Sequence, residues 1–142
     1  MKKITCFFTL FILLFTSCST SEDDNIEESE NEILGKWFYV AESYDEQQIT
    51  HPENCFTQQY YEFFSNGSVS VKLYSEPCED GENYTGDYAI SGNTLEITGL
   101  QGSDDLNYSF SIVTLNNTTL IIEDEVSIDG VNETYRLELN KE

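Results

Sequence analysis

Short runs of alternating apolar and polar residues, separated by turn residues, constrain the fold of this chain more than any other feature. Residues 58–64 (QQYYEFF) and 68–74 (SVSVKLY) flank Ser-Asn-Gly, and similar runs continue to residue 139. Successive side chains of a β-strand point to opposite faces, so each run predicts a strand with one buried face. No amphipathic helical pattern separates the runs. The sequence therefore predicts an all-β domain.

Eight strands are predicted in hairpin succession, each joined to the next by a short turn. Their ranges are 35–44, 58–64, 68–74, 84–91, 94–99, 106–115, 119–126 and 132–139. Because no crossover helix is expected between them, neighbouring strands should be antiparallel, in a meander or a barrel. Closing the meander would remove both exposed edges, which protects all-β chains from edge-to-edge association.

The hairpin at Ser-Asn-Gly allows its register to be predicted. A two-residue loop would place Val71 opposite a glutamate, which mixes apolar and charged partners. A three-residue loop that ends at Gly67 instead places Val71 opposite Tyr61. Since a slip of one residue turns a whole face around, we predict the second register, with Gly67 in a left-handed bulge conformation.

The start of the chain predicts export and lipid attachment. Two lysines precede an apolar run over residues 4–15, which at about 1.5 Å per residue is too short to cross a bilayer of about 30 Å. A basic start, an apolar middle and small residues before a cysteine are typical of a secretory signal peptide. The residues before Cys18 resemble a bacterial lipoprotein lipobox, which implies that residues 1–17 are removed and that Cys18 carries a lipid. The alternative is a secreted protein with an incidental cysteine.

An acidic tether is expected after the lipidated cysteine, so that residues 18–32 link the anchor to the domain. Residues 19–32 hold seven carboxylates and no base. Such a segment buries too little apolar surface to order itself. Residues 21–24 (SEDD) resemble the tag that sends some lipoproteins to the cell-surface face of the outer membrane. The alternative is a solvated spacer on a protein that faces the periplasm.

The charge balance argues against nucleic acid as a partner. All 27 acidic residues follow Cys18, but of the six bases two precede it, so the mature chain carries 6 − 2 − 27 = −23. Binding to nucleic acid requires cationic side chains that displace counterions from phosphate. Anionic lipid headgroups should also repel this chain, so the acyl anchor is the expected membrane contact.

Two cysteines, Cys55 and Cys78, remain in the folded domain. The predicted hairpin register leaves them within one residue of opposition. Because the exported compartment is oxidising, we expect a disulfide that closes a loop of about 24 residues and contributes roughly 3 kcal/mol. A metal pair with His51 is the alternative, but one histidine and two cysteines seldom form a zinc site. No metal ion or cofactor is expected.

Three segments carry a resemblance to a known family. ILGKWFYV (33–40), YYEFFSNGSVSV (60–71) and GDYAISGNTLEIT (86–98), together with the placement of the two cysteines, resemble the short lipocalin-like domain of bacterial lipoproteins. The resemblance covers residues 33–139 and implies that residues 33–142 form an eight-stranded antiparallel up-and-down barrel. Unlike full-length lipocalins, the chain has no room for a C-terminal helix after its last strand.

The resemblance also implies how one end of the barrel is closed. Gly35-Lys36-Trp37 matches the Gly-x-Trp of lipocalin first strands, in which the tryptophan plugs one end. Lipocalins commonly pack an arginine of the last strand over this ring, which implies a barrel-closing pair of Trp37 and Arg136. A guanidinium over an indole contributes about 0.5–2 kcal/mol. The alternative is a solvent-facing Arg136 that pairs with a glutamate of its own strand.

The inward-facing residues could either line a ligand cavity or fill a core. An eight-stranded barrel is just wide enough for both arrangements. Strand alternation gives as inward candidates Trp37, Tyr39, Ala41, Tyr61, Phe63, Val69, Val71, Leu73, Tyr88 and Ile90. The candidate ligand-lining residues among them are Tyr39, Tyr61, Phe63, Val71, Leu73 and Tyr88.

Two functions of different classes remain open. The first is a membrane-anchored lipoprotein that binds a small apolar or amphipathic ligand. The second is a non-catalytic protein-interaction module, such as an inhibitor, accessory or immunity-type protein, with a solid barrel core. A filled barrel would exclude the first function, whereas an apolar pocket above roughly 300 Å³ would favour it.

Neither catalysis nor calcium binding is expected. The single histidine, His51, lies in a loop-like THPEN segment with no plausible nucleophile nearby. Carboxylates are so abundant that no single pair of them indicates an active site. The acidic segments 75–84 and 123–130 lack the ligand spacing of an EF-hand, so we expect them to be solvated loops.

Overall fold

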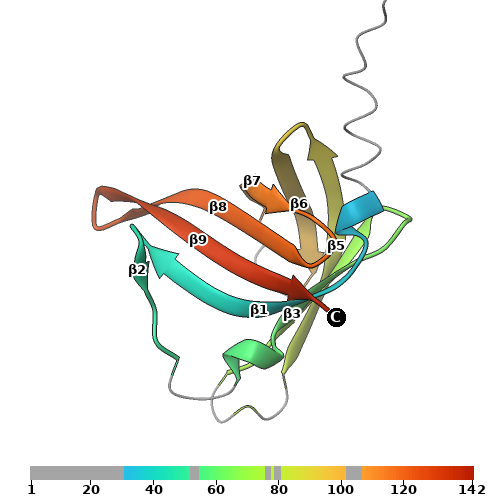
Figure 1. Ribbon diagram of the computed structural model, residues 1–142, viewed down its shortest axis with the longest axis horizontal. Coiled ribbons are helices and arrows are strands. Elements are labelled where there is room, and N and C mark those ends of the chain that lie inside the picture. Colours follow the sequence, from blue (N-terminus) through green and yellow to red (C-terminus); the bar gives the residue numbers. More distant parts are fainter. Residues whose placement is uncertain (1–30, 52–54, 76–77, 79–80, 102–106) are drawn as a thin grey trace, which may run out of the picture.

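A single antiparallel sheet closes on itself to form the molecule (Figure 1). The computed structural model describes residues 31–51, 55–75, 78, 81–101 and 107–142, so the predicted signal peptide, Cys18 and most of the predicted tether lie outside the described residues. The strands are β1 (Gly35–Tyr44), β2 (Gln47–Gln48), β3 (Tyr60–Phe63), β4 (Ser68–Leu73), β5 (Glu82–Ser91), β6 (Thr94–Gln101), β7 (Tyr108–Leu115), β8 (Thr119–Ile128) and β9 (Val131–Lys141), with a 3₁₀ turn η1 (Phe56–Gln58) before β3.

The first and last long strands close the barrel. β1 pairs with β3 through residues 35–38 and with β9 through residues 37–44, so its two ends have different neighbours. Leaving aside the two-residue β2, which pairs with the end of β1, eight antiparallel strands form the ring. The predicted eight-stranded barrel is therefore confirmed.

The β3–β4 hairpin has the predicted register. Tyr61 lies opposite Val71, and Phe63 lies opposite Val69. Gly67 has φ +80°, a left-handed conformation that glycine adopts without steric cost. The register predicted from the match between apolar residues is therefore confirmed.

A β-bulge in β1 reverses the predicted alternation. Tyr39 lies opposite Leu139, but after the bulge Glu42, rather than Ala41, lies opposite Leu137. Both leucines are buried, so the face that carries them is the inner face. Ala41, which alternation placed inside the barrel, therefore points outward, and Glu42 takes the inward position. An extra residue in one strand shifts the facing of every later residue in that strand.

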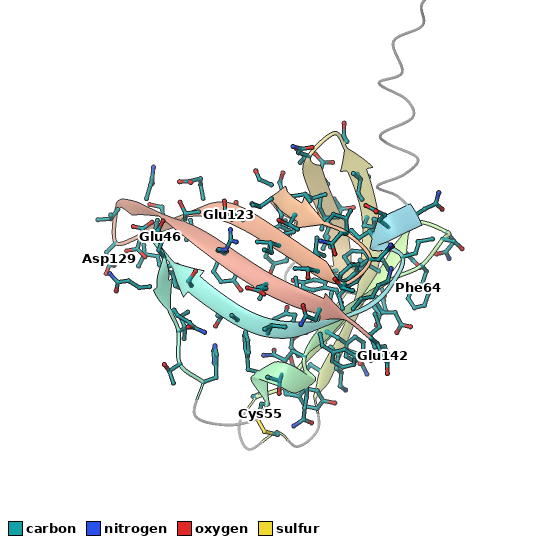
Figure 2. The ribbon with its side chains drawn as sticks, in the orientation of Figure 1. Glu46, Cys55, Phe64, Glu123, Asp129 and Glu142 are labelled. Atoms are coloured by element: carbon teal, nitrogen blue, oxygen red, sulfur yellow. A yellow bond between two sulfur atoms is a disulfide. The ribbon has the colours of Figure 1, made fainter. Side chains whose placement is uncertain are left out.

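Apolar side chains fill the end of the barrel where β1 begins. The side chains with less than 2% exposure are Ile33, Trp37, Val69, Leu95, Ile97, Leu120, Ile122, Leu137 and Leu139. This core and the closing β1–β9 ladder are formed by residues between Ile33 and Lys141. Figure 2 shows Phe64 and Glu142 at one end of the molecule and Glu46 and Asp129 at the other.

Trp37 closes the filled end, but with a different cation from the predicted one. Its indole Nε1 donates a hydrogen bond of 2.6 Å to the carbonyl oxygen of Ile33. The Nζ of Lys141 lies 5.0 Å from the centre of the indole ring and donates to the carbonyl oxygen of Glu32 at 2.8 Å.

The predicted pair of Trp37 and Arg136 is wrong. Arg136 lies opposite Ser43 in the ladder, far along β1 from the tryptophan, and its guanidinium pairs with Glu123. Because Leu137 is buried and successive residues of β9 alternate, Arg136 points to the outer face of the barrel.

Candidate functional site

A cavity of about 440 Å³ opens at the end of the barrel where β1 finishes, opposite Trp37. Its walls come from β1, η1, β3, β4, β7, β8 and β9 and from the segments that flank η1. The aromatic and apolar lining residues are Tyr39, Tyr44, Phe56, Tyr61, Leu73, Tyr108, Phe110, Val126 and Tyr135. The other lining residues are Glu42, His51, Gln59 and Asp124.

Stacked aromatic rings form much of the cavity wall. Tyr39 stacks on Tyr61 with ring centres 5.6 Å apart, and Phe56 packs edge-on against Tyr39 at 5.4 Å. On another part of the wall, Tyr108 stacks on Phe110 at 5.7 Å. Such rings give a large apolar contact area at a small cost in conformational entropy.

The two stacked tyrosines stay protonated at neutral pH. Burial raises the pKa of Tyr61 to about 12. Burial, followed by the nearby Tyr61 hydroxyl, raises the pKa of Tyr39 well above its ordinary value. Both groups are therefore neutral phenols, which can orient a ligand by hydrogen bonding without adding charge to the cavity.

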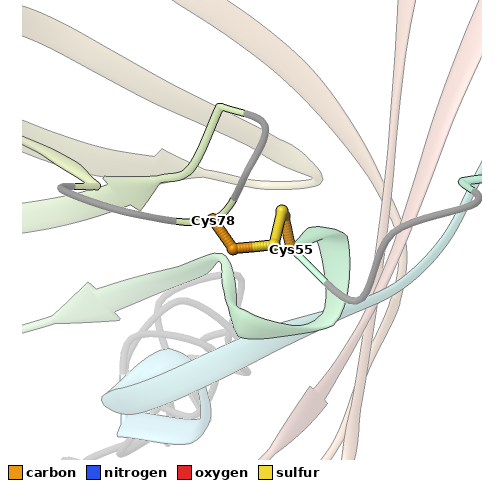
Figure 3. Close-up of a disulfide and its surroundings, with 2 residues drawn as sticks. All are labelled: Cys55 and Cys78. Atoms are coloured by element: carbon orange, nitrogen blue, oxygen red, sulfur yellow. A yellow bond between two sulfur atoms is a disulfide. The ribbon is translucent and has the colours of Figure 1, made fainter.

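A disulfide holds η1 in place beside the cavity. Cys55, directly before η1, is bonded to Cys78 in the segment after β4, with Cα atoms 5.1 Å apart (Figure 3). The predicted disulfide is confirmed. The next residue, Phe56, packs on the cavity wall, and the imidazole of His51 stacks flat on it with centres 4.0 Å apart. The cross-link is therefore adjacent to Phe56, the ring on which His51 stacks.

Three polar side chains are joined at the cavity mouth. Glu42 accepts a hydrogen bond from the Tyr135 hydroxyl at 2.8 Å, and its other carboxylate oxygen lies 2.8 Å from His51 Nε2. Burial, and then the hydrogen bond to Glu42, raise the pKa of Tyr135, so the phenol remains a donor at neutral pH. Tyr44 packs against Tyr135 with ring centres 5.2 Å apart. The carboxylate is thus held in a defined position.

Half of the predicted ligand-lining residues line the cavity. Those that do are Tyr39, Tyr61 and Leu73. Phe63 and Val71 are buried in the core below it. Tyr88 packs edge-on against Phe63 at 5.0 Å and its hydroxyl donates to a backbone carbonyl near the filled end. Alternation predicted the correct, inward face for Phe63, Val71 and Tyr88. It does not predict how far along the barrel axis each residue lies.

Two lining residues that were not among the predicted ones, Asp124 and Val126, could have been found from the alternation pattern of the sequence. Along β8, Leu120 and Ile122 are buried, so the same alternation carries Asp124 and Val126 into the barrel. The expectation of a solvated loop over residues 123–130 is wrong for most of that segment, because β8 continues to Ile128.

Other lining residues could not be found in this way. Glu42 enters the cavity through a bulge that no glycine or proline marks. His51 and Phe56 line the cavity from outside the long strands, and Phe56 directly follows the disulfide-bonded Cys55.

Two further observations concern the described part of the chain. Within it, no three His, Cys, Asp or Glu side chains gather closely enough to hold a metal ion. None of its helical segments has the length and apolar character that spanning a membrane requires.

Comparison with known proteins agrees with this architecture. A family model described as a lipocalin-like domain matches residues 33–122, which is more than half of the chain. The chain therefore belongs to the family of lipocalin-like domains. No curated protein sequence matches it.

Several solved structures are similar to this chain at low sequence identity. An uncharacterized protein from Bacteroides eggerthii is 14% identical, with a TM-score of 0.53, over 77% of this chain and 98% of that chain. Bovine odorant-binding protein in complex with a selenium-containing odorant is 18% identical, with a TM-score of 0.46, over 80% and 72% of the two chains. The bovine lipocalin allergen Bos d 2 is 14% identical, with a TM-score of 0.48, over 80% and 75%.

Proposed function

We propose that this chain is an exported lipoprotein whose barrel binds one small apolar or amphipathic molecule and performs no catalysis. The observation that supports it is the cavity of about 440 Å³, with an aromatic wall and a few polar groups at its mouth. Sites for small molecules are commonly of this kind, being concave, mostly apolar and equipped with a few positioned polar groups.

The cavity also bears on the alternative, a solid interaction module. Apolar side chains fill the Trp37 end, but the volume at the other end exceeds the roughly 300 Å³ at which ligand pockets begin. An interaction module has no need of stacked, neutral tyrosines that face an open interior. We therefore favour ligand binding over recognition by the acidic exterior.

For the subcellular location, we propose that the protein is attached to the outer membrane through Cys18, with the barrel on the cell surface. This proposal is supported by the lipobox-like residues before Cys18 and by the acidic residues 21–24. Lipid chains insert favourably into a bilayer, whereas the acidic barrel should be repelled from anionic headgroups.

The binding proposal can be tested with the neutral fluorophore N-phenyl-1-naphthylamine, whose emission rises in an apolar site. A chain that begins at Ser19 and has formed its disulfide should give saturable fluorescence enhancement. Val126→Trp, which fills the cavity from β8, should weaken binding of the fluorophore at least tenfold.

The matched control is Val113→Trp on β7, because Val113 is 48% exposed and does not line the cavity. This variant should bind the fluorophore as the unmodified chain does. If the unmodified chain gives no saturable signal, or if both variants retain full affinity, then the cavity is not a binding site.

A further inference from the structure

We propose that the cavity selects amphipathic amines, so that an organic ammonium lies beside the carboxylates of Glu42 and Asp124 and its apolar body packs on the tyrosine wall. This inference rests on the proposed ligand binding and narrows it to one class of ligand. Two observations support it. Carboxylates line the cavity, and the lysine and arginine side chains make their contacts outside it.

Two strand features direct carboxylates into the barrel. The bulge in β1 turns Glu42 inward, opposite the buried Leu137. In β8, Asp124 continues the inward series of Ile122 and lies opposite Tyr135 in the ladder. Both carboxylates therefore belong to the cavity wall rather than to the solvated exterior.

The two carboxylates differ in what already binds them. Glu42 uses one oxygen to accept from Tyr135 and the other to contact His51. A carboxylate has about four acceptor positions, so Glu42 can still accept from a ligand. Asp124 has no ion pair or side-chain hydrogen bond within the part of the chain that the structure describes. Asp124 is therefore the stronger candidate for direct contact with an ammonium.

No lysine or arginine is available to neutralise these carboxylates. The lysines and the arginine after Cys18 are Lys36, Lys72, Arg136 and Lys141, all of which are described, and none of them lines the cavity. Each is engaged elsewhere: two pair with glutamates on the outer face and two donate to backbone carbonyls.

The sign of the ligand's head group follows from this arrangement. A carboxylate or sulfate would meet neither lysine nor arginine in this acidic, partly desolvated cavity, and the imidazole of His51 already faces Glu42. Its entry would therefore cost free energy. An ammonium would find partners, and the formal charge of −21 on the whole chain would also attract it.

Aromatic rings beside the carboxylates add to the preference for a cation. Tyr44 and Tyr135 pack together at 5.2 Å beside Glu42, and Tyr108 also lines the cavity. The negative face of such a ring attracts an ammonium, and the attraction is stronger where the cation is desolvated. A neutral alcohol with the same apolar tail would gain neither this interaction nor the ion pair.

The test is displacement of N-phenyl-1-naphthylamine by decylamine, decanol and decanoate, which share one tail and differ in head-group charge. Near neutral pH, decylamine should displace the fluorophore at a concentration at least tenfold below that of decanol, and decanoate should be the weakest. Asp124→Asn should remove most of the advantage of decylamine over decanol and leave displacement by decanol unchanged.

Asp87→Asn, the same substitution at an exposed site on the outer face of β5, should leave the preference unchanged. If the fluorophore binds but the three compounds displace it equally, or decanoate is the strongest, the amine inference fails while ligand binding stands. The inference also fails if the two asparagine variants lose the preference to the same extent. Absence of saturable fluorophore binding would instead overturn the proposed function itself.

Discussion

Lys141 stabilises the filled end of the barrel through two contacts of one ammonium group. The cation lies over the indole ring of Trp37 and also donates to the carbonyl oxygen of Glu32, next to the carbonyl that accepts from the indole. The short helical segment over residues 31–33 is thereby tied to the last strand. Alternation along β9 explains why this cation is Lys141 and not Arg136. Lys141 lies on the same inward face as Leu137 and Leu139, whereas Arg136 lies on the outer face.

Replacing Lys141 with methionine should therefore affect the tryptophan directly. Methionine keeps the apolar stem but loses the cation, so we expect the free energy of unfolding to fall by about 1–2 kcal/mol. The emission maximum of Trp37, the single tryptophan, should also shift. Urea unfolding followed by tryptophan fluorescence measures both effects.

Arg136→Met is the matched control for the lysine variant. Arg136 forms a partly exposed ion pair with Glu123 on the outer face, and such pairs contribute about 0–1 kcal/mol. Its substitution should leave the emission of Trp37 unchanged. A shift in Arg136→Met without one in Lys141→Met would contradict the structural assignment and restore the pairing that the family resemblance implied.

At the scale of strands and loops, local pattern predicted the parts of the fold that depend on alternation. The β3–β4 register followed from matching Tyr61 with Val71, because a slip would have buried a charge. The same rule, applied to β8 beyond Ile122, would have placed Asp124 in the cavity.

The rest of the site depends on information that alternation does not contain. The bulge that turns Glu42 inward has no marker residue, since neither glycine nor proline occurs near it in β1. Phe56 follows a cysteine whose disulfide partner lies 23 residues away in the sequence, and His51 stacks on the Phe56 ring. Long-range contacts of this kind become visible only when the whole barrel is assembled.

Removal of the disulfide should affect both stability and binding, since η1 carries Phe56. In the double variant Cys55→Ser, Cys78→Ser we expect the free energy of unfolding to fall by about 3 kcal/mol. Affinity for N-phenyl-1-naphthylamine should fall as well, because Phe56 is no longer held against Tyr39. Urea unfolding and fluorophore titration measure the two losses.

A reductant provides the control for the cysteine variant. It should lower the stability and the affinity of the unmodified chain to the values of the double variant and should leave the double variant unchanged. Equal stability of the oxidised chain and the double variant would show that the cross-link does not constrain the η1 segment.

For the whole molecule, the ends of the barrel have different roles. The described chain begins at the filled end, where Ile33 is buried and its carbonyl accepts from Trp37. The cavity lies at the other end. The β8–β9 turn projects beyond that end of the ring (Figure 1). With the proposed anchor at Cys18, the tether would join the barrel at its filled end, and its fourteen residues would reach at most about 50 Å. The anchor would then be attached at the end of the barrel that does not carry the cavity mouth.

The proposed anchor can be tested in the full chain with its two cysteines outside the domain. Cys18→Ala removes the acceptor of the lipid, so the protein should move from the membrane fraction to the soluble fraction after cell lysis. Cys6→Ala, the same substitution within the apolar run of the predicted signal peptide, should leave the protein in the membrane fraction. Protease treatment of intact cells should then degrade the unmodified protein if its barrel is at the cell surface. Membrane association of Cys18→Ala equal to that of Cys6→Ala would contradict lipid anchoring, because the acidic barrel has little affinity of its own for anionic headgroups.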